Sequence, residues 1–229
     1  MTASDEGVVL RILPYGESDA VVGLFTEHHG RISAFARGAR RSQKRFGGAL
    51  DLFTELRLEL SSGLRSRSAL WRLDRVELRE AHIELRRNLG RLAQAEYLAE
   101  CLWSFAPEGE AQTALYAWWK GALRRLCEAS DPRAIAHELD LELLSHSGYA
   151  PHWQSCTECG RGVPAGRFFF SFEKGGAICT ECRPRGEGRW LEPQDRVSVQ
   201  GAVSAYVSYT LGKEPRSQRF REEVFRDGE

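Results

Sequence analysis

The hydrophobic period of this chain changes once, near residue 82, and that change most constrains the fold. Before it, apolar and polar residues alternate, most strictly in Glu55-Leu56-Arg57-Leu58-Glu59-Leu60, which is the pattern of a strand with one buried face. After it, apolar residues recur every three or four positions, as they do on one face of a helix. The chain is therefore predicted to be α+β, with strands and helices in separate segments.

Five short strands are expected within residues 1–82. The strand signal covers residues 8–13, 19–26, 31–36, 55–60 and 71–78, and His28-His29-Gly30 is expected to form a turn. The apolar phase changes between Leu73 and Val76, which predicts a β-bulge near Asp74. Five short strands in about 75 residues favour a small closed barrel, and we expect one of the OB type that binds oligonucleotides.

Three antiparallel helices are expected next, as a central bundle over residues 83–150. Apolar stripes cover residues 85–102, 111–126 and 135–143, and Asp131-Pro132 has the form of a helix start. Three tryptophans, Trp103, Trp118 and Trp119, are expected in the bundle core. Residues 191–229 are expected to add one helix over 199–210 that packs on the bundle, followed by a loosely held polar tail.

Two pairs of cysteines predict a zinc finger over residues 151–190. They are spaced C-x2-C-x19-C-x2-C, which lets two tight turns place four thiolates around one ion. The expected ligands of one structural zinc ion per chain are Cys156, Cys159, Cys179 and Cys182. Catalytic zinc is the alternative, but four cysteines leave no open position for water. Disulfides are a second alternative, and His152 is surplus to the four ligands.

A basic segment lies between the third and fourth predicted strands. The chain as a whole has 32 basic and 32 acidic residues, yet residues 30–50 hold six basic residues and no acidic one. Lys and Arg that neutralise phosphates supply most of the non-specific affinity for nucleic acid, and nearby aromatic rings can stack on bases. The candidate DNA contacts are Arg37, Arg40, Arg41, Lys44, Arg45 and Phe46, with Arg65 and Arg67 from a second loop. Phe35 and Phe53 are further stacking candidates. The alternative is a solvated basic hairpin with phenylalanines in the core.

Several function classes lack their signals. There is no G-x-x-x-x-G-K-[ST] motif, no H-E-x-x-H motif and no carboxylate cluster for a two-metal nuclease, so no enzyme is expected. The apolar runs are too short for a membrane span, and the N-terminus does not resemble a signal peptide. We therefore expect a cytoplasmic protein with no membrane partner.

Motifs along the whole chain are similar to those of one family. They include Tyr15-Gly16-Glu17-Ser18-Asp19, Arg37-Gly38-Ala39-Arg40-Arg41, the two Cys-x-x-Cys pairs and Ser217-Gln218-Arg219-Phe220. In order and spacing the chain resembles the RecO family of bacterial recombination-repair mediators. The resemblance implies an N-terminal OB barrel (residues 1–82), a central helical bundle (83–150), an inserted zinc finger (151–190) and a C-terminal helix with a tail (191–229).

The same resemblance implies a non-enzymatic DNA-binding protein. Members of the family bind single- and double-stranded DNA and anneal complementary strands, including strands coated by single-strand binding protein (SSB). With RecR they help to load RecA, and the expected location is the nucleoid-associated cytoplasm. The basic residues of the 37–45 segment would contact phosphates, and Arg216, Arg219 and Arg221 are candidates for a second DNA surface.

Two other functions stay open on the sequence. One is a zinc-ribbon module that holds protein partners and has no annealing activity of its own. The other is a zinc-dependent hydrolase, which would need an open position at the metal.

Overall fold

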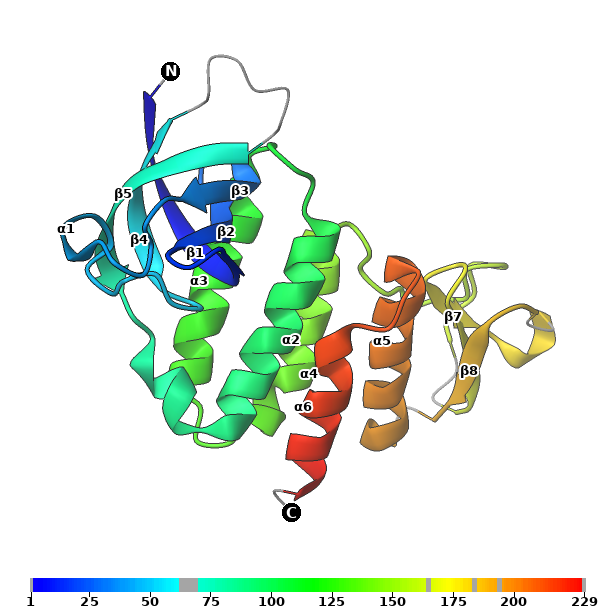
Figure 1. Ribbon diagram of the computed structural model, residues 1–229. Coiled ribbons are helices and arrows are strands. Elements are labelled where there is room, and N and C mark those ends of the chain that lie inside the picture. The colour runs from blue at the N-terminus through cyan, green and yellow to red at the C-terminus, as the bar shows by residue number, and fades with distance from the viewer. Residues whose placement is uncertain (1, 62–69, 164–165, 183–184, 193–194, 228–229) are drawn as a thin grey trace. The chain divides into compact units, whose positions relative to one another are not determined.

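A computed structural model describes residues 2–61, 70–163, 166–182, 185–192 and 195–227 (Figure 1). The chain divides into two compact units, Met1–Ser130 and Asp131–Glu229. The first unit contains the predicted barrel and two of the predicted helices. The second contains the third helix, the cysteine-rich segment and the C-terminal region. The division into four domains stays a prediction.

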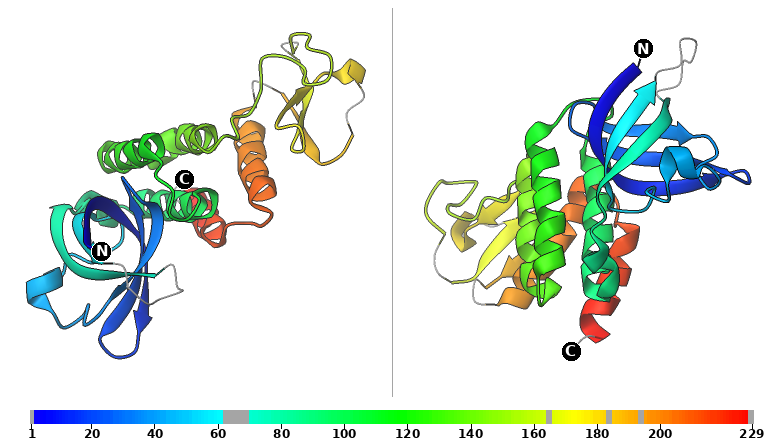
Figure 2. Two further views of the ribbon diagram at one scale, coloured as in Figure 1. Left: turned by 90° about the horizontal axis from the view of Figure 1, so that it is seen from above. Right: turned by 90° about the vertical axis from the view of Figure 1, so that its left-hand side faces the viewer.

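The first five strands close into a barrel. They are β1 (Thr2–Tyr15), β2 (Asp19–Thr26), β3 (Gly30–Ala36), β4 (Glu55–Ser61) and β5 (Leu70–Glu80), in the spatial order β1-β2-β3-β5-β4. Neighbours are antiparallel except for β3 and β5, which run parallel where residues 33–35 lie beside residues 70–72. Figure 2 shows the barrel from above in its left view. This arrangement confirms the predicted OB-type barrel.

Alternation along β4 and β5 fills the barrel. Leu56, Leu58 and Leu60 are at most 1% exposed, whereas the residues between them face solvent. On β5, pairing with β4 skips Asp74, because Leu73 pairs with Leu60 and the next pair is Arg75 with Glu59. The predicted bulge at Asp74 is therefore confirmed. It lets Leu73 and Val76 both face the core although they stand three residues apart.

Two helices pack on the barrel within the first unit. After a 3-10 turn, η1 (Ile83–Arg87), the chain forms α2 (Leu89–Phe105) and α3 (Thr113–Glu128). Aromatic contacts join α3 to the barrel: Phe25 lies 6.1 Å from Tyr116, and Phe53 lies 6.4 Å from Trp119, between ring centres. Within the described residues, no helix has the length and apolar character that a membrane span requires.

Trp103 of α2 does not lie in the core of the helical bundle, contrary to the prediction from sequence. Its ring centre lies 3.7 Å from the guanidinium carbon of Arg11 and 5.0 Å from that of Arg31, and both arginines belong to barrel strands. Gly23 makes this approach possible, because a β-carbon there would stand 2.5 Å from Arg11 and 2.7 Å from Trp103. The indole therefore packs on the outer face of the barrel.

A buried carboxylate also links the barrel to its helices. Glu55 at the start of β4 is 4% exposed, and its oxygens lie 2.9 Å from His82 Nε2 and 3.0 Å from Lys120 Nζ. Burial alone would raise the pKa of Glu55, but the hydrogen bonds from these two side chains outweigh it and lower the pKa. Glu55 is thus held as a carboxylate between strand, turn and helix.

The second unit combines three helices with a small sheet. The helices are α4 (Pro132–His146), α5 (Arg196–Leu211) and α6 (Arg216–Asp227), and the sheet has the order β7-β6-β8, with β6 (Phe168–Ser171), β7 (Gly176–Ile178) and β8 (Gly188–Leu191). Asp131 accepts the N–H of Arg133, which confirms the predicted start of α4. The predicted 199–210 helix is confirmed as α5, which packs on α4 and β8 (Figure 2).

The C-terminal tail differs from prediction, because it forms the helix α6. Its residue Arg221 is 5% exposed, and its Nη1 lies 2.7 Å from Oδ2 of Asp140 on α4. Nη2 donates to Ser204 of α5 at 3.0 Å. A charged group this deep needs a charged and hydrogen-bonded partner, and here it has both. Arg221 therefore anchors the helix and is not part of a second DNA surface.

We predict that Arg221→Ala frees α6 from its unit. Removing one partner of a buried ion pair costs about 3–5 kcal/mol, because the other charge stays buried and unpaired. Amide hydrogen exchange across residues 216–227 should become fast, while exchange in the barrel stays slow. The control is Arg219→Ala on the same helix, whose side chain is 80% exposed and pairs with Glu214 at the surface. Equal protection of α6 in both variants would contradict the anchoring role.

Candidate nucleic-acid interface and metal centre

The predicted basic segment is a loop beside the barrel (Figure 1). It leaves β3 after Ala36, passes through the one-turn helix α1 (Gln43–Phe46) and returns to β4 at Glu55. We call residues 37–45 the basic loop. Four of its cationic residues are exposed to solvent: Arg37, Arg40, Arg41 and Lys44. The loop therefore presents a local cluster of positive charge on a chain that is neutral overall.

The turn between β1 and β2 holds the basic loop in place. The Asp19 carboxylate accepts the N–H of Gly38 at 2.7 Å, and the Ser18 carbonyl accepts the N–H of Arg40 at 3.0 Å. Gly38 adopts a φ of 67°, a conformation that glycine tolerates best. Two motifs that lie apart in the sequence, residues 15–19 and residues 37–41, thus form one structure.

Arg45 braces the loop from within. Its Nη2 donates to the carbonyl of Arg37 at 2.5 Å, and its Nε donates to Ser42 Oγ at 3.1 Å. Arg45 is only partly exposed, and its guanidinium carbon lies 5.0 Å from the centre of the Phe46 ring. Because these donors bond to other residues of the loop, Arg45 mainly stabilises the conformation of the loop.

The remaining loop cations are available to an anion. Arg41 lies 3.3 Å from Glu17, but both side chains are more than 70% exposed, and a surface pair of this kind is worth about 0–1 kcal/mol. Within the described part of the chain, no acidic side chain pairs with the other exposed loop cations, Arg37, Arg40 and Lys44. The predicted contacts Arg65 and Arg67 lie outside the described residues and stay predictions.

Two of the aromatic residues predicted to stack on bases are buried in the structure. Phe46 and Phe53 are each 2% exposed, because α1 and the segment before β4 turn their rings inward. A ring buried in this way cannot stack on a base, so the prediction of Phe46 as a DNA contact is wrong. Phe35 is partly exposed and lies edge-on to Tyr15, which is 61% exposed, with ring centres 5.7 Å apart. Tyr15, which the sequence did not single out as a stacking candidate, is the more exposed of the two rings.

The four predicted cysteine ligands come together in the second unit. All four sulfurs lie within 4.8 Å of one another, and Cys159 Sγ is 3.9 Å from Cys179 Sγ. A tetrahedral zinc ion with Zn–S distances of about 2.3 Å would hold its sulfurs about 3.8 Å apart. The cluster therefore fits a tetrahedral ion and can hold a metal.

The electrostatics of the cluster also favour a cation. A hydrogen bond from Arg161 lowers the pKa of the Cys159 thiol to about 6, whereas hydrogen bonding with Cys179 and Cys159 raises the pKa of Cys182 to about 12. Four sulfurs this close can all ionise only if a positive ion balances them. His152 is not needed as a metal ligand, and its Nε2 is hydrogen-bonded to Ser155 Oγ at 2.7 Å.

The small sheet and the cluster support each other. Phe169 of β6 and Ile178 of β7 pack against Cys156 and Cys179, and η2 (Thr180–Cys182) carries the last ligand. On the other face of β6, Phe170 stacks on Trp153 at 4.4 Å. The cysteine cluster and the small sheet therefore share one small core.

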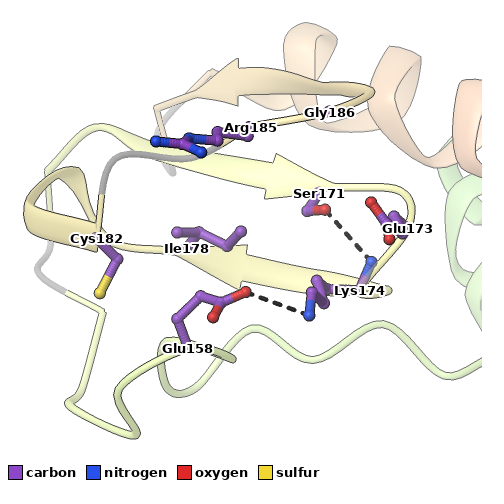
Figure 3. Close-up of a pocket in the computed structure, with 8 residues that line it drawn as sticks. All are labelled: Glu158, Ser171, Glu173, Lys174, Ile178, Cys182, Arg185 and Gly186. Carbon is purple, nitrogen blue, oxygen red and sulfur yellow. Dashed lines mark hydrogen bonds and ion pairs between the residues drawn. The ribbon is translucent and has the colours of Figure 1, made fainter.

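A cavity of about 370 Å³ opens beside the cluster (Figure 3). Cys182 and Ile178 line it together with four charged side chains, Glu158, Glu173, Lys174 and Arg185. Lys174 Nζ pairs with Glu158 at 3.4 Å, and the Lys174 N–H is bonded to Ser171 Oγ at 3.3 Å. Two acidic and two basic groups balance each other, so the cavity has no net preference for an anion or a cation.

Comparison with known proteins places these features in one family. Residues 1–82 match the family described as "Recombination protein O N terminal", and residues 86–194 match "Recombination protein O C terminal". A DNA repair protein RecO from Myxococcus xanthus is 32% identical over 96% of this chain and 97% of its own length. Another, from Anaeromyxobacter sp. (strain K), is 34% identical over 95% of both chains. A third, from Anaeromyxobacter dehalogenans (strain 2CP-C), is 41% identical over 78% of this chain and 69% of its own.

We predict that the purified chain carries one tightly bound metal ion per molecule. Cys179→Ser should abolish it, because the oxygen is a poor substitute for the thiolate. The segment 151–192 should then become sensitive to protease, since binding of zinc to such sites is worth apparent ~10–16 kcal/mol. His152→Ala is the matched control and should retain the metal, measured by elemental analysis. Loss of the ion in the His152 variant as well would contradict the four-cysteine site.

Proposed function

The chain belongs to the RecO family of DNA repair proteins, and we propose that it acts there by binding DNA through the basic loop. The observation that carries this proposal is the exposed cationic cluster of Arg37, Arg40, Arg41 and Lys44 on an OB-type barrel. Barrels of this type bind oligonucleotides through loops and one strand face. Guanidinium groups suit this role because they offer several donors to phosphate.

We propose that this binding serves to anneal complementary strands. Contacts to phosphates read no base sequence, so the protein would bind single- and double-stranded DNA with little sequence preference. Two strands repel each other through their phosphates, and a cationic surface screens that repulsion. In the family setting, the strands would include those coated by SSB, and with RecR the protein would help to load RecA.

We propose that the role is not enzymatic and that the ion in the cysteine cluster is structural zinc. Four thiolates complete a tetrahedral shell, which leaves no position for an activated water. Bound zinc would fix the cysteines against which the small sheet packs, Cys156 and Cys179. No residue of the chain would carry out a reaction at the ion. A DNA-repair role also fits the expected location in the nucleoid-associated cytoplasm.

We predict that Arg40→Glu with Arg41→Glu weakens binding to single-stranded DNA and flattens its salt dependence. The slope of log K against log salt is negative, and each lost phosphate contact reduces its steepness by about 0.7, so the loss of two contacts reduces it by about 1.4. Fluorescence anisotropy of a labelled oligonucleotide over a salt series gives both the affinity and the slope.

The matched control changes the same charge elsewhere on the barrel. Arg57→Glu with Arg75→Glu alters two exposed residues on β4 and β5, so the net charge shifts by the same amount. We expect this control to keep the wild-type slope. If both double variants lose the same affinity and slope, the effect comes from net charge and the basic loop is not the binding site.

A further inference from the structure

Tyr15 is an exposed aromatic residue at the end of β1, just before the turn that holds the basic loop. Its side chain is 61% exposed at the end of β1, and among the described residues its hydroxyl has no hydrogen-bond partner. The neighbouring Leu13 on the same strand is 51% exposed. Large apolar side chains exposed side by side on a strand end favour a contact with a ligand over a purely structural role.

Phe35 packs against the edge of the Tyr15 ring system. The two rings meet edge to face, with their centres 5.7 Å apart and their planes at 84°. Strand pairing explains the contact, because Tyr15 pairs with Asp19 while Val21 pairs with Leu13 on one side and with Phe35 on the other. The contact uses little of the Tyr15 surface, so most of the ring faces solvent.

The turn that follows Tyr15 is hydrogen-bonded to the backbone of the basic loop. Phe35 and Arg37 are two residues apart, about 7 Å along an extended chain. The turn that follows Tyr15 carries Ser18 and Asp19, which bond to the backbone of the basic loop at 3.0 Å and 2.7 Å. The exposed ring and the basic loop are therefore joined by one short, hydrogen-bonded turn.

We propose that Tyr15 is the stacking platform for an unpaired base of single-stranded DNA whose phosphates lie on the basic loop. The inference rests on the proposed function and deepens it, because it names the element that distinguishes single strands from duplex. A base in a duplex is already stacked on its neighbours, whereas a base in a single strand can stack on an aromatic side chain. The cations bind both forms of DNA, and Tyr15 contributes only to the single strand.

The test compares three probes on wild type and variants at one salt concentration, and a salt series is added for oligothymidylate. The probes are a labelled oligothymidylate, an abasic oligomer of equal length and a blunt-ended duplex of two strands. Tyr15→Ala should weaken binding of oligothymidylate roughly fivefold to a hundredfold, the range found when a stacking aromatic residue is removed. Binding of the duplex and of the abasic oligomer should be unchanged, and so should the salt slope for oligothymidylate. Tyr15→Phe should restore wild-type affinity, because it keeps the ring.

Controls separate stacking from a structural role. Tyr149→Ala removes another exposed tyrosine, which is 44% exposed and belongs to the other unit, and should bind all probes as the wild type does. Equal loss of oligothymidylate and duplex in Tyr15→Ala would overturn the inference, because Tyr15 would then merely position the loop. Unchanged binding of oligothymidylate in that variant would overturn it too. If the wild type binds neither oligothymidylate nor the duplex, the proposed function itself fails.

Discussion

The parallel pairing of β3 with β5 is the constraint that gives the basic loop its place. It closes the barrel in the order β1-β2-β3-β5-β4, so β3 and β4 follow each other in the chain but are not neighbours in the sheet. The segment between Ala36 and Glu55 must therefore cross from one part of the barrel to another. A short hairpin turn cannot do this, and the crossing segment is long enough to carry the basic loop. Barrel closure thus gives the cations a place outside the hydrogen-bonded strands.

The crossing segment would be a flexible loop if nothing held it. The β1–β2 turn binds its backbone at Gly38 and Arg40, and Arg45 bonds to the Arg37 carbonyl and to Ser42 from inside. A loop ordered before it meets its ligand loses less conformational entropy on binding. The charge of the basic loop is therefore presented in a defined arrangement, although its members are surface arginines.

Short sequence patterns predicted the elements whose conformation is determined by residues close together in the chain. The alternating leucines of residues 55–60 identified a barrel strand, and the phase change around Asp74 identified a bulge. The Asp131-Pro132 pair marked the start of α4. The cysteine spacing predicted the cluster, because two tight turns leave few other ways to place the four sulfurs.

The remaining features depend on partners far away in the sequence. Phe46 resembles an exposed aromatic residue in a basic loop until the barrel core is known to receive it. Arg221 resembles a tail cation because its partner Asp140 lies 81 residues earlier. Tyr15 is an ordinary turn residue until Phe35 and the basic loop are seen beside it. Periodicity cannot show any of these contacts, since each needs the folded arrangement of separate segments.

Strand annealing is the activity that most directly tests the view of this chain as a phosphate-binding mediator. Two complementary oligonucleotides, one carrying a fluorophore and the other a quencher, would be mixed with the full chain and no nucleotide at about 50 and 200 mM salt, a range over which phosphate-driven binding falls steeply. We expect the protein to accelerate annealing at the lower salt and to lose most of that effect at the higher. Folded, metal-loaded protein that leaves the annealing rate unchanged at both concentrations would contradict the account.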